Sequence, residues 1–490
     1  MEFDLEFSRL GATVQSLGSA VENTSNTLNK PVLLKGEKQT LETDNGRYCF
    51  TAALLMLLRM TQNLSVQIPG SPEFVSEMKT LAAKMTDRAI IFVESENLDY
   101  QTFEAILNIG SYVRNDLPWT TINSDGWLAR VASGSTNLPS TYTRTNPLGA
   151  LGAAALGATE IFKRIFRIKP SRGPIHEFLS FSLFSYTQSD DPGPPLPKTF
   201  DLTGVLQVGA GAIGNGIDFL LSRVPGTGNW SIVDLQKFRK ENLGTCILIG
   251  PRDLTHPKAH VLAETVAGAK GFAMTVEQFM TDVVGKEVPY PEIVINGLDN
   301  VDARRAVQTL WPAVAIDGAI GTFSCEVTIH PWGPDLSCLL CDFERTAEDA
   351  AARSSKLTGI GLDKLSNLTN LLSEEDILAA PEKKRPWLRE HLGKQYCSIV
   401  SAAELAAVSD EENTNFEPSV PFVACLSSCM VVAELIRYAS SWEPVLETGF
   451  QFDALIGPQN GIRKAHQRKQ ACLCVQRRDV IEQLRRNRVR

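Results

Sequence analysis

Several common features are scarce in this 490-residue chain, and each scarcity excludes a class of protein. The most apolar stretch, residues 146–162 (NPLGALGAAALGATEIF), is too short and too rich in small residues to predict a membrane span. The acidic start MEFDLEFSRL lacks the apolar core of a signal peptide. The net charge of −8 lacks the positive excess of a nucleic-acid or acidic-membrane binder. We therefore expect a cytoplasmic protein with no nucleic-acid or membrane partner, whose ten cysteines are reduced.

The chain is longer than one hydrophobic core usually supports, so two or three domains are expected. Residues 185–204 are rich in Pro, Gly, Asp and Ser and predict a linker. After them, apolar strands and helices alternate, which predicts a mainly parallel sheet covered by helices on both faces. The first 190 residues have their own α/β pattern but no glycine-rich fingerprint, and no short internal repeat is visible. Residues 345–395 are polar and helical and predict an inserted helical subdomain.

A glycine-rich turn lies within residues 203–234, TGVLQVGAGAIGNGIDFLLSRVPGTGNWSIVD. An apolar strand leads into Gly209, Gly211 and Gly214 and then into an apolar helix, and a second strand ends at Asp234. Such glycines let the backbone approach phosphate oxygens at a helix N-terminus, and a strand-end carboxylate accepts from ribose hydroxyls. The spacing predicts a mononucleotide-binding βαβ unit but does not distinguish NAD from ATP.

Three later residues favour ATP. Asn242 follows Asp234, Lys258 begins the next predicted helix, and Asp299 lies where the strand in "INGLDN" ends. A dehydrogenase needs neither a lysine aimed at phosphates nor a strand-end carboxylate for Mg²⁺, whereas an adenylating enzyme needs both. An NAD-dependent oxidoreductase is the competing class.

Residues 200–345 resemble the E1/ThiF/MoeB superfamily, whose members adenylate the C-terminal glycine of ubiquitin-like proteins. The matched elements, in order, are GAGAIG, VD, ENLG, PKA, GLDN…R, DGAIGTFSCEV and CLLC, followed by Cys472 and Cys474. The resemblance implies a Rossmann-like α/β adenylation domain with ATP and Mg²⁺ as cofactors. It implies that Gly209, Gly211 and Gly214 line the nucleotide loop, Asp234 binds ribose, Asn242 and Lys258 face the ATP phosphates, and Asp299 binds Mg²⁺ and is central to adenylation. Arg304 matches a family arginine whose role is either structural or direct.

Two positions depart from the family pattern. Thr245 replaces the phosphate-binding arginine, and Gln236 replaces the second Asp of D-x-D. Either this domain borrows a cation or its adenylation is weak. In the weak case the chain is a non-catalytic scaffold that binds a ubiquitin-like protein and an E2-like protein. The cations considered as replacements are Arg9, Arg47, Arg239 and Arg252.

Two cysteine pairs suggest a metal. Cys338 and Cys341 form a C-x-x-C pair suited to one tetrahedral ion, and Cys472 and Cys474 supply two more thiolates. The resemblance joins such pairs into one structural Zn²⁺ site, although C-x-x-C is usual where this chain has C-x-C. Replacement of one thiolate by His466, or four ordinary reduced cysteines, are the alternatives.

One cysteine remains as a nucleophile after the others are assigned. Cys425 and Cys429 lie four apart in an apolar run and read as helix core, while Cys49, Cys246 and Cys325 lie in or beside apolar segments. By elimination Cys397, which follows the polar insert, is the candidate nucleophile. Thioester-forming E1 enzymes carry a C-T/S-I/V motif that Cys397-Ser398-Ile399 resembles, and residues 405–420 would then cross over the tail of the ubiquitin-like protein. An incidental loop thiol is the alternative.

Together these interpretations divide the chain into four parts. Residues 1–190 are expected to form an inactive adenylation-like α/β domain, 191–344 the nucleotide-binding part of the active adenylation domain, 345–400 the helical insert with the cysteine loop, and 401–490 the crossover loop, the rest of the adenylation domain and the zinc-binding tail. An E2-like or unrelated partner-binding domain is the alternative for residues 1–190.

The expected function is activation of a ubiquitin-like protein. The carboxylate is adenylated, passed to Cys397 as a thioester and transferred to an E2-like protein, with a JAMM-type deubiquitinase as a further member of the pathway. This organisation is similar to that of bacterial E1-like proteins of antiphage operons, of the Bil and CBASS types. Sulfur-carrier protein adenylyltransferases of the ThiF/MoeB type are the nearest alternative.

Overall fold

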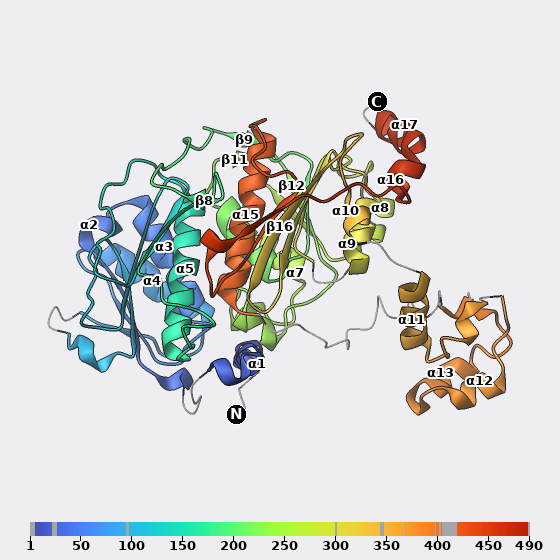
Figure 1. The fold of residues 1–490 in the computed structure, drawn as a ribbon, viewed down its shortest axis with the longest axis horizontal. Coiled ribbons are helices and arrows are strands. Elements are labelled where there is room, and N and C mark those ends of the chain that lie inside the picture. Colours follow the sequence, from blue (N-terminus) through green and yellow to red (C-terminus); the bar gives the residue numbers. More distant parts are fainter. Residues whose placement is uncertain are drawn as a thin grey trace. The chain divides into compact units, whose positions relative to one another are not determined.

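The computed structural model describes residues 5–21, 27–94, 98–298, 301–343, 347–367, 369–396, 398–400, 403 and 419–488. The chain forms two compact units, one of residues 1–342 with 417–490 and one of residues 343–416 (Figure 1). The smaller unit contains α11 (Ala347–Thr358), α12 (Glu374–Ala379) and α13 (Arg385–Arg389), packed around its own apolar core. The helical insert expected from the sequence, residues 345–400, lies within the bounds of this unit.

The larger unit contains two eight-stranded sheets with the same strand order. The first sheet has the order β3-β2-β1-β4-β5-β6-β7-β8, and the second has the order β13-β12-β10-β14-β15-β16-β17-β18. In both sheets the first five strands in this order run parallel, and the remaining three are joined antiparallel. The chain therefore repeats one α/β topology, although its sequence shows no visible repeat.

The strand bounds are as follows. The first sheet comprises β1 (Val32–Gly36), β2 (Leu64–Gln67), β3 (Ile91–Phe92), β4 (Ala105–Ile109), β5 (Trp119–Asp125), β6 (Leu128–Ala132), β7 (Phe178–Ser182) and β8 (Thr187–Gln188). The second comprises β10 (Val205–Val208), β12 (Trp230–Val233), β13 (Ala269–Phe272), β14 (Ile293–Asn296), β15 (Val314–Ile320), β16 (Ser324–Pro331), β17 (Gly449–Asp453) and β18 (Ile462–Lys464). A small parallel pair joins β9 (Phe200–Asp201) to β11 (Gly226–Thr227), so the expected linker at 185–204 carries β8 and β9.

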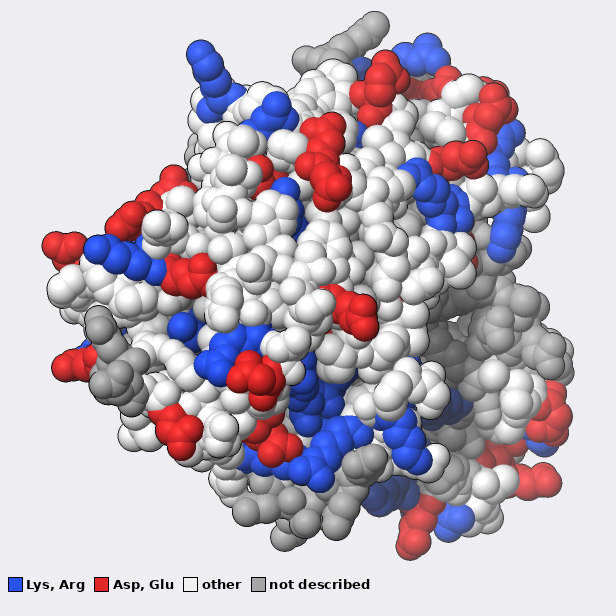
Figure 2. All heavy atoms as spheres, turned by 60° about the vertical axis from the view of Figure 1, so that its left-hand side comes forward, with Lys and Arg blue, Asp and Glu red and all other residues white. Residues whose placement is uncertain are grey.

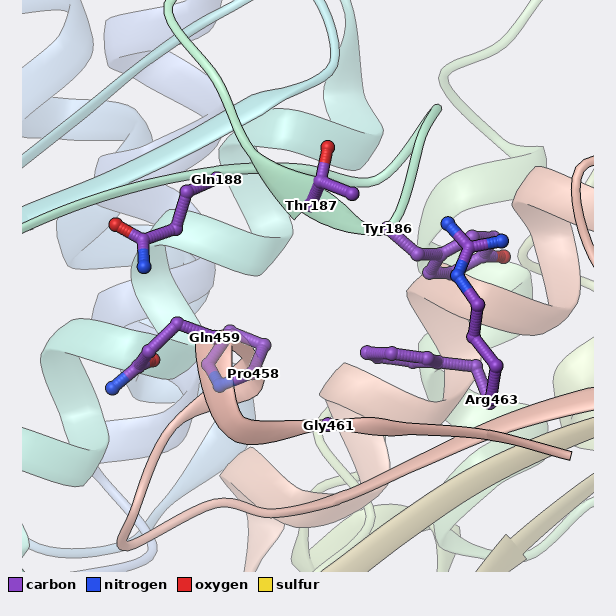
Figure 3. A pocket seen from close by; sticks show the side chains of 8 residues that line it. Tyr186, Thr187, Gln188, Pro458, Gln459, Gly461 and Arg463 are labelled. Atoms are coloured by element: carbon purple, nitrogen blue, oxygen red, sulfur yellow. The ribbon is translucent and has the colours of Figure 1, made fainter.

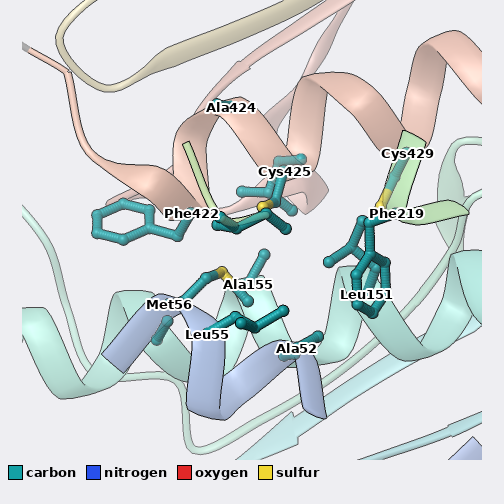
Figure 4. Close-up of a cluster of buried hydrophobic side chains, with 14 of the residues drawn as sticks. Ala52, Leu55, Met56, Leu151, Ala155, Phe219, Phe422, Ala424, Cys425 and Cys429 are labelled. Carbon is teal, nitrogen blue, oxygen red and sulfur yellow. The ribbon is translucent and has the colours of Figure 1, made fainter. Parts of the chain in front are cut away.

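Four apolar helices pack together where the two halves meet. They are α3 (Asp44–Leu57) and α5 (Pro147–Ile165) from the first half, and α6 (Ala212–Leu221) and α15 (Pro421–Ala439) from the second. Figure 4 shows their side chains packed against one another, with Leu151 and Ala155 on α5 facing Cys429 and Cys425 on α15. The small residues of α5 permit a close approach to the first sheet: a Cβ on Gly157 would lie 2.8 Å from side-chain atoms of both Ile122 and Leu107.

Helix α5 begins with a capped first turn. Asn146 caps it by accepting a hydrogen bond from the Leu148 N–H, and Pro147 occupies its first turn. Helix α15 is long and apolar enough to cross a membrane by length and composition, but 89% of its apolar window is buried inside the protein. It is therefore the central core helix of the second half, in the place that α5 takes in the first.

Shorter helices complete the larger unit. They are α1 (Ser8–Ser16), α2 (Lys38–Leu41), α4 (Pro72–Met85), α7 (Lys258–Ala263), α8 (Val276–Asp282), α9 (Val301–Gln308), α10 (Leu339–Asp342), α16 (Leu473–Gln476) and α17 (Arg478–Arg488). On the face drawn in Figure 2, acidic and basic side chains are interspersed around a broad area that is mostly uncharged. The net charge of −8 is thus not gathered into one patch on this face.

Candidate nucleotide site and cysteine cluster

The three glycines of the loop after β10 have three different structural environments. Gly209 has a φ of 95°, which favours glycine. A Cβ on Gly214 would lie 2.5 Å from the Gly209 carbonyl oxygen, so α6 approaches the turn closely only because this residue has no side chain. Gly211 caps α6, and a Cβ there would meet nothing within 4 Å, so this part of the loop faces open space. The open side is where a phosphate would approach the start of α6.

Asp234 is held against this loop. It follows β12, and its two carboxylate oxygens each accept a backbone hydrogen bond, Oδ2 from the Ala210 N–H at 2.8 Å and Oδ1 from the Gln236 N–H at 2.7 Å. These bonds fix the carboxylate at the carboxyl ends of two neighbouring parallel strands. This is the edge of an open α/β sheet at which ligands bind.

Lys258 lies beside the same edge and begins α7. Its Nζ donates to Gln236 Oε1 at 2.7 Å, and its side chain is largely buried. Gln236 is one of the two positions that depart from the family pattern, and its amide oxygen orients the lysine without neutralising it. Among the described residues Lys258 forms no ion pair, so its positive charge remains available to an anion.

Asn242 lies in the short 3₁₀ helix Lys240–Gly244, where its Oδ1 accepts from the Arg239 N–H at 2.9 Å. Thr245 ends that helix and is buried. The 3₁₀ helix is covered by the N-terminal segment of the first half, because Leu5–Phe7 and α1 pack on it, and a Cβ on Gly244 would lie 2.6 Å from the Glu6 carbonyl oxygen. The first half therefore reaches the loop that carries Asn242 and Thr245.

The four cations proposed to replace the family arginine lie in different places. Burial raises the pKa of the Cys246 thiol, and the positive charges of Lys258 and Arg9 oppose that shift, which places both cations near Thr245. Arg47 instead donates to the Leu41 carbonyl oxygen within the first half. Arg239 immediately precedes the 3₁₀ helix Lys240–Gly244, and Arg252 lies in a second 3₁₀ helix, Pro251–Asp253, that packs on α4.

Arg304 holds the chain that leaves β14. Its guanidinium donates from both Nε and Nη2 to the Leu298 carbonyl oxygen, at 3.1 and 2.6 Å, and its Nε lies 3.4 Å from Asp317 Oδ1. Asp299 itself, the proposed Mg²⁺ ligand, lies outside the described residues. The arginine thus fixes the backbone immediately before it.

Two buried carboxyl groups near the loop could not be assigned from the sequence. Burial raises the pKa of Asp317 to about 7, although Arg304 opposes the shift. Burial also raises the pKa of Asp218 on α6 well above its usual value. Gln207 joins Asp218 to the loop, because its amide donates to Asp218 Oδ2 and to the Gly209 carbonyl oxygen, both at 3.4 Å. The only sign of this contact in the sequence was Gln207 itself, a polar residue within the apolar strand "VLQV".

The structure brings together four cysteines that are far apart in the sequence. The sulfur atoms of Cys338, Cys341, Cys472 and Cys474 all lie within 4.8 Å of one another. The distances are 3.9 Å from Cys338 to Cys341, 3.7 Å from Cys338 to Cys472, and 3.6 Å from Cys341 to Cys474. Four sulfurs bound tetrahedrally at about 2.3 Å from Zn²⁺ would be separated by about 3.8 Å. The four thiols therefore fit a Zn²⁺ ion without rearrangement.

Neighbouring groups reinforce this arrangement. The hydrogen bond between the Cys338 and Cys341 thiols lowers the pKa of Cys341 and raises the pKa of Cys338, so Cys341 is the first of the two to become a thiolate. His466 pairs with Asp342, the residue after Cys341, and His330 Nε2 lies 3.4 Å from the same carboxylate. His466 therefore lies beside the cysteine cluster and not in place of one of its thiols.

Cys397 lies outside the described residues, as does most of the expected crossover segment 405–420. Cys425 and Cys429 lie on the buried helix α15, where burial raises the pKa of both thiols. Neither is suited to act as a nucleophile at neutral pH, as their spacing in the sequence predicted.

A cavity of about 420 Å³ lies elsewhere, between the edge strands of the two sheets. Tyr186, Thr187 and Gln188 at β8 line one side of it, and Phe450, Pro458, Gln459, Gly461 and Arg463 line the rest (Figure 3). It contains none of the residues predicted from the sequence to bind nucleotide or metal.

The chain is similar to several known proteins. The chain is 24% identical over 399 residues to the uncharacterized protein y4jF of Sinorhizobium fredii, a match covering 75% of this chain and 74% of y4jF. E. coli MccB in complex with MccA-N7isoASN matches with a TM-score of 0.35 and 12% identity over 56% of this chain and 67% of that one. E. coli MccB with ATP matches with a TM-score of 0.34 and 11% identity over 56% of this chain and 66% of that one.

The model of the ThiF family matches residues 196–474, which include the glycine loop, Asp234, Lys258, α15 and all four clustered cysteines. This match covers more than half of the chain. The protein belongs to the ThiF family.

Proposed function

We propose that this protein activates a ubiquitin-like protein by adenylating the carboxylate of its C-terminal glycine. As a member of the ThiF family, the chain is an adenylating, E1-like enzyme that uses ATP and Mg²⁺. One observation supports this proposal most strongly. The glycine loop, Asp234 and Lys258 lie together at one edge of the second sheet, and the neutral amide of Gln236 orients Lys258.

The proposed reaction is a displacement at the α-phosphorus of ATP. A carboxylate oxygen of the ubiquitin-like protein forms a bond to this phosphorus, the bond to the β-phosphate oxygen breaks, and pyrophosphate leaves. Negative charge accumulates on the leaving group, and Lys258 is proposed to offset it. Asp299 is proposed to hold Mg²⁺, which supplies further positive charge to the phosphates.

Arg9 is our choice among the cations that replace the arginine missing at Thr245. Helix α1 packs on the 3₁₀ helix Lys240–Gly244, and Arg9 acts electrostatically on Cys246, next to Thr245. Arg47 is a matched control because its guanidinium is directed to the Leu41 carbonyl oxygen within the first half. We expect Arg9→Ala to lower ATP–pyrophosphate exchange and Arg47→Ala to leave it near the wild-type rate. Equal effects of the two changes would reject Arg9.

The first 190 residues are proposed to be an inactive adenylation-like domain. The identical strand order of the two sheets and the pairing of α5 with α15 support an internal pseudo-dimer. The two copies contribute different parts, since the first half supplies the N-terminal segment that covers the nucleotide edge of the second. This arrangement favours a pseudo-dimer within one chain over an unrelated partner-binding domain.

The next step is proposed to be thioester formation on Cys397, followed by transfer to an E2-like protein. An acyl-adenylate must be passed on before water hydrolyses it, and a thiolate is an effective acceptor. The thiolate forms a bond to the acyl carbon, and AMP leaves. A cytoplasmic pathway that includes a JAMM-type deubiquitinase and acts in antiphage defence is the setting we propose, by resemblance alone.

The adenylation step is tested by ATP–pyrophosphate exchange with a candidate ubiquitin-like protein that ends in glycine. We expect exchange in the wild type and its loss in both Asp299→Ala and Lys258→Ala. ATP binding without turnover in the presence of the partner would instead indicate a non-catalytic scaffold. Reduction of NAD without use of ATP would overturn the proposal.

The thioester step is tested on a non-reducing gel with ATP and Mg²⁺. We expect an adduct that dithiothreitol removes and that Cys397→Ala abolishes while exchange persists. An adduct that survives in Cys397→Ala would move the nucleophile to another cysteine. Exchange without any adduct would favour a sulfur-carrier adenylyltransferase.

A further inference from the structure

The shared topology lets each position of the second half be assigned a counterpart in the first. Lys35 on β1 pairs with Asn108 on β4, just as Val208 on β10 pairs with Asn296 on β14. In each half the residue of the central strand in this pair is followed directly by a glycine. Gly36 follows Lys35 in the first half, and Gly209 follows Val208 in the second. Because the pairings match, counting forward from them relates the two halves residue by residue.

The count gives three correspondences at the functional edge. Glu37 corresponds to Ala210, Ser111 to Asp299, and Tyr112 to Asn300. By this count the first half has a serine at the sequence position of Asp299, the proposed Mg²⁺ ligand. It has a carboxylate instead in the loop after the central strand, where the second half has only small residues.

The Glu37 carboxylate is bound by the end of β4. Its Oε1 accepts from Asn108 Nδ2 at 2.7 Å and from the Tyr112 N–H at 2.9 Å. Its Oε2 accepts from the Ser111 N–H at 3.1 Å and from Ser111 Oγ at 3.3 Å. Two backbone donors and two side-chain donors therefore converge on one carboxylate.

The backbone around this carboxylate is shaped to hold it. A Cβ on Gly110 would lie 2.1 Å from Glu37 Cδ, so only glycine leaves room for the carboxylate there. Asn108 is fully buried, and its amide also donates to the Tyr112 carbonyl oxygen at 3.1 Å and to Thr121 Oγ1 at 3.3 Å, whereas the Ser111 and Tyr112 N–H groups donate to Glu37. Donors of this kind cost free energy when they lose their acceptor, and hydrogen bonds to an ionised acceptor are among the stronger ones.

We propose that the first half contains an anion-binding site at the edge that corresponds to the nucleotide edge of the second half, and that Glu37 fills it permanently. The tethered carboxylate excludes nucleotide from the first half, so one chain binds one nucleotide. Removing the carboxylate leaves a site whose size and donors suit a small free carboxylate such as formate. The anion site rests on the duplicated topology and the contacts of Glu37, and the exclusion of nucleotide rests also on the nucleotide site proposed above.

The first test is chemical rescue of Glu37→Ala. We expect this variant to unfold at a lower temperature than the wild type, and sodium formate to restore part of the loss in a saturable manner. Sodium chloride at equal ionic strength should not do so. Glu42→Ala is the matched control, because Glu42 is an exposed glutamate a few residues further on and should show neither the loss nor the rescue. Absence of a formate-specific rescue would overturn the proposal.

A second variant covers the case in which Glu37→Ala does not fold. Glu37→Gln keeps the volume but directs an amide N–H₂ group toward donors, so we expect a lower unfolding temperature without rescue by formate. An unfolding temperature equal to that of the wild type would show that the charge is not required and would reject the inference.

Calorimetric titration with ATP counts the nucleotide sites directly. We expect one site per wild-type chain, and two sites would also reject the inference. Failure to bind any ATP would count against the adenylation proposal and leave the rescue experiment decisive for Glu37.

Discussion

Asp317 shows how burial changes the chemistry of a single residue. It is 2% exposed on β15, and the burial of its carboxyl group raises its pKa from 3.8 to about 7. Arg304 lowers this pKa, whereas the negative charges of Glu326 and Asp342 raise it further. The folded protein therefore holds a proton on Asp317 at pH values where the unfolded chain has lost it.

This shift predicts a pH-dependent stability. Between pH 4 and about 7 the folded state binds one more proton than the unfolded state at this residue, so stability falls as pH rises, by at most about 1.4 kcal/mol per pH unit. We expect Asp317→Asn, which cannot ionise, to gain stability relative to the wild type from pH 5 to 7, with no further gain above. Denaturant unfolding of both proteins at several pH values measures the difference, and a difference that is constant with pH would contradict the prediction.

At the scale of an element, the start of α6 depends on two glycines in different ways. Gly214 is in close contact, since a Cβ there would lie 2.5 Å from the Gly209 carbonyl oxygen. Gly211 faces open space and has a φ of −81°, outside the left-handed region that favours glycine. The same substitution at these two positions therefore separates the folding of the loop from its use.

We expect Gly214→Ala to destabilise the protein by about 1–3 kcal/mol, because α6 must move away from the loop. Gly211→Ala should leave stability within about 0.5 kcal/mol of the wild type. If the open side of the loop receives phosphates, Gly211→Ala should weaken ATP binding although the fold is intact. Thermal unfolding and ATP titration on both variants check this, and unchanged ATP binding in Gly211→Ala would place the nucleotide elsewhere.

At the scale of the whole molecule, the two halves share one core. Phe422 on α15 is fully buried, and its ring centroid lies 5.5 Å from that of Phe162 on α5, so this aromatic contact joins the halves. Truncating a buried phenylalanine typically costs about 3–5 kcal/mol. We expect Phe422→Ala to lower stability by that amount while the larger unit still unfolds in a single transition.

Phe178→Ala is the matched control, because Phe178 on β7 is 42% exposed and should lose much less stability. Calorimetry or denaturant unfolding followed by two probes would distinguish one transition from two. Separate unfolding of the halves in Phe422→Ala would show that they are independent domains.

The C-terminal tail is a second feature of the whole molecule. Two of the four clustered cysteines lie at α16, and α17 docks beside them through Ile481 and through Arg485, whose guanidinium donates to the Trp311 carbonyl oxygen. If Zn²⁺ occupies the cluster, its binding free energy stabilises this docking.

Removing the metal with a chelator should therefore lower the unfolding temperature and make α17, which is rich in arginine, more sensitive to trypsin. The double variant Cys472→Ser with Cys474→Ser should reproduce both effects and not respond further to chelator. Metal analysis of untreated protein should find one Zn²⁺ per chain. A wild type whose stability and proteolysis do not respond to chelator would leave the four cysteines as reduced thiols.

Several features of this protein could be predicted from the sequence because they depend on neighbours along the chain. The glycine loop requires a strand, three glycines at fixed spacing and a helix, and all of these are adjacent in residues 203–222. The N-terminus of α5 follows from Asn146 and Pro147 in the same way. The cysteine cluster could be predicted only in part. Its two pairs are local motifs, but only the family resemblance implied that they meet.

Other features required the tertiary structure, because they depend on residues that the fold brings together from distant segments. The duplicated topology shows in the sequence only as an α/β pattern in both halves without a visible repeat, since a sheet is specified by buried apolar strands and backbone pairing, which many sequences satisfy. Arg9 reaches the loop around Thr245 only because α1 packs across the two halves. In the sequence Glu37 is an ordinary glutamate in the segment "LLKGEKQ". Only the pairing of β1 with β4 brings it to the N–H groups of Ser111 and Tyr112. Local spacing therefore determined the motifs, while long-range strand pairing decided which groups meet at each edge.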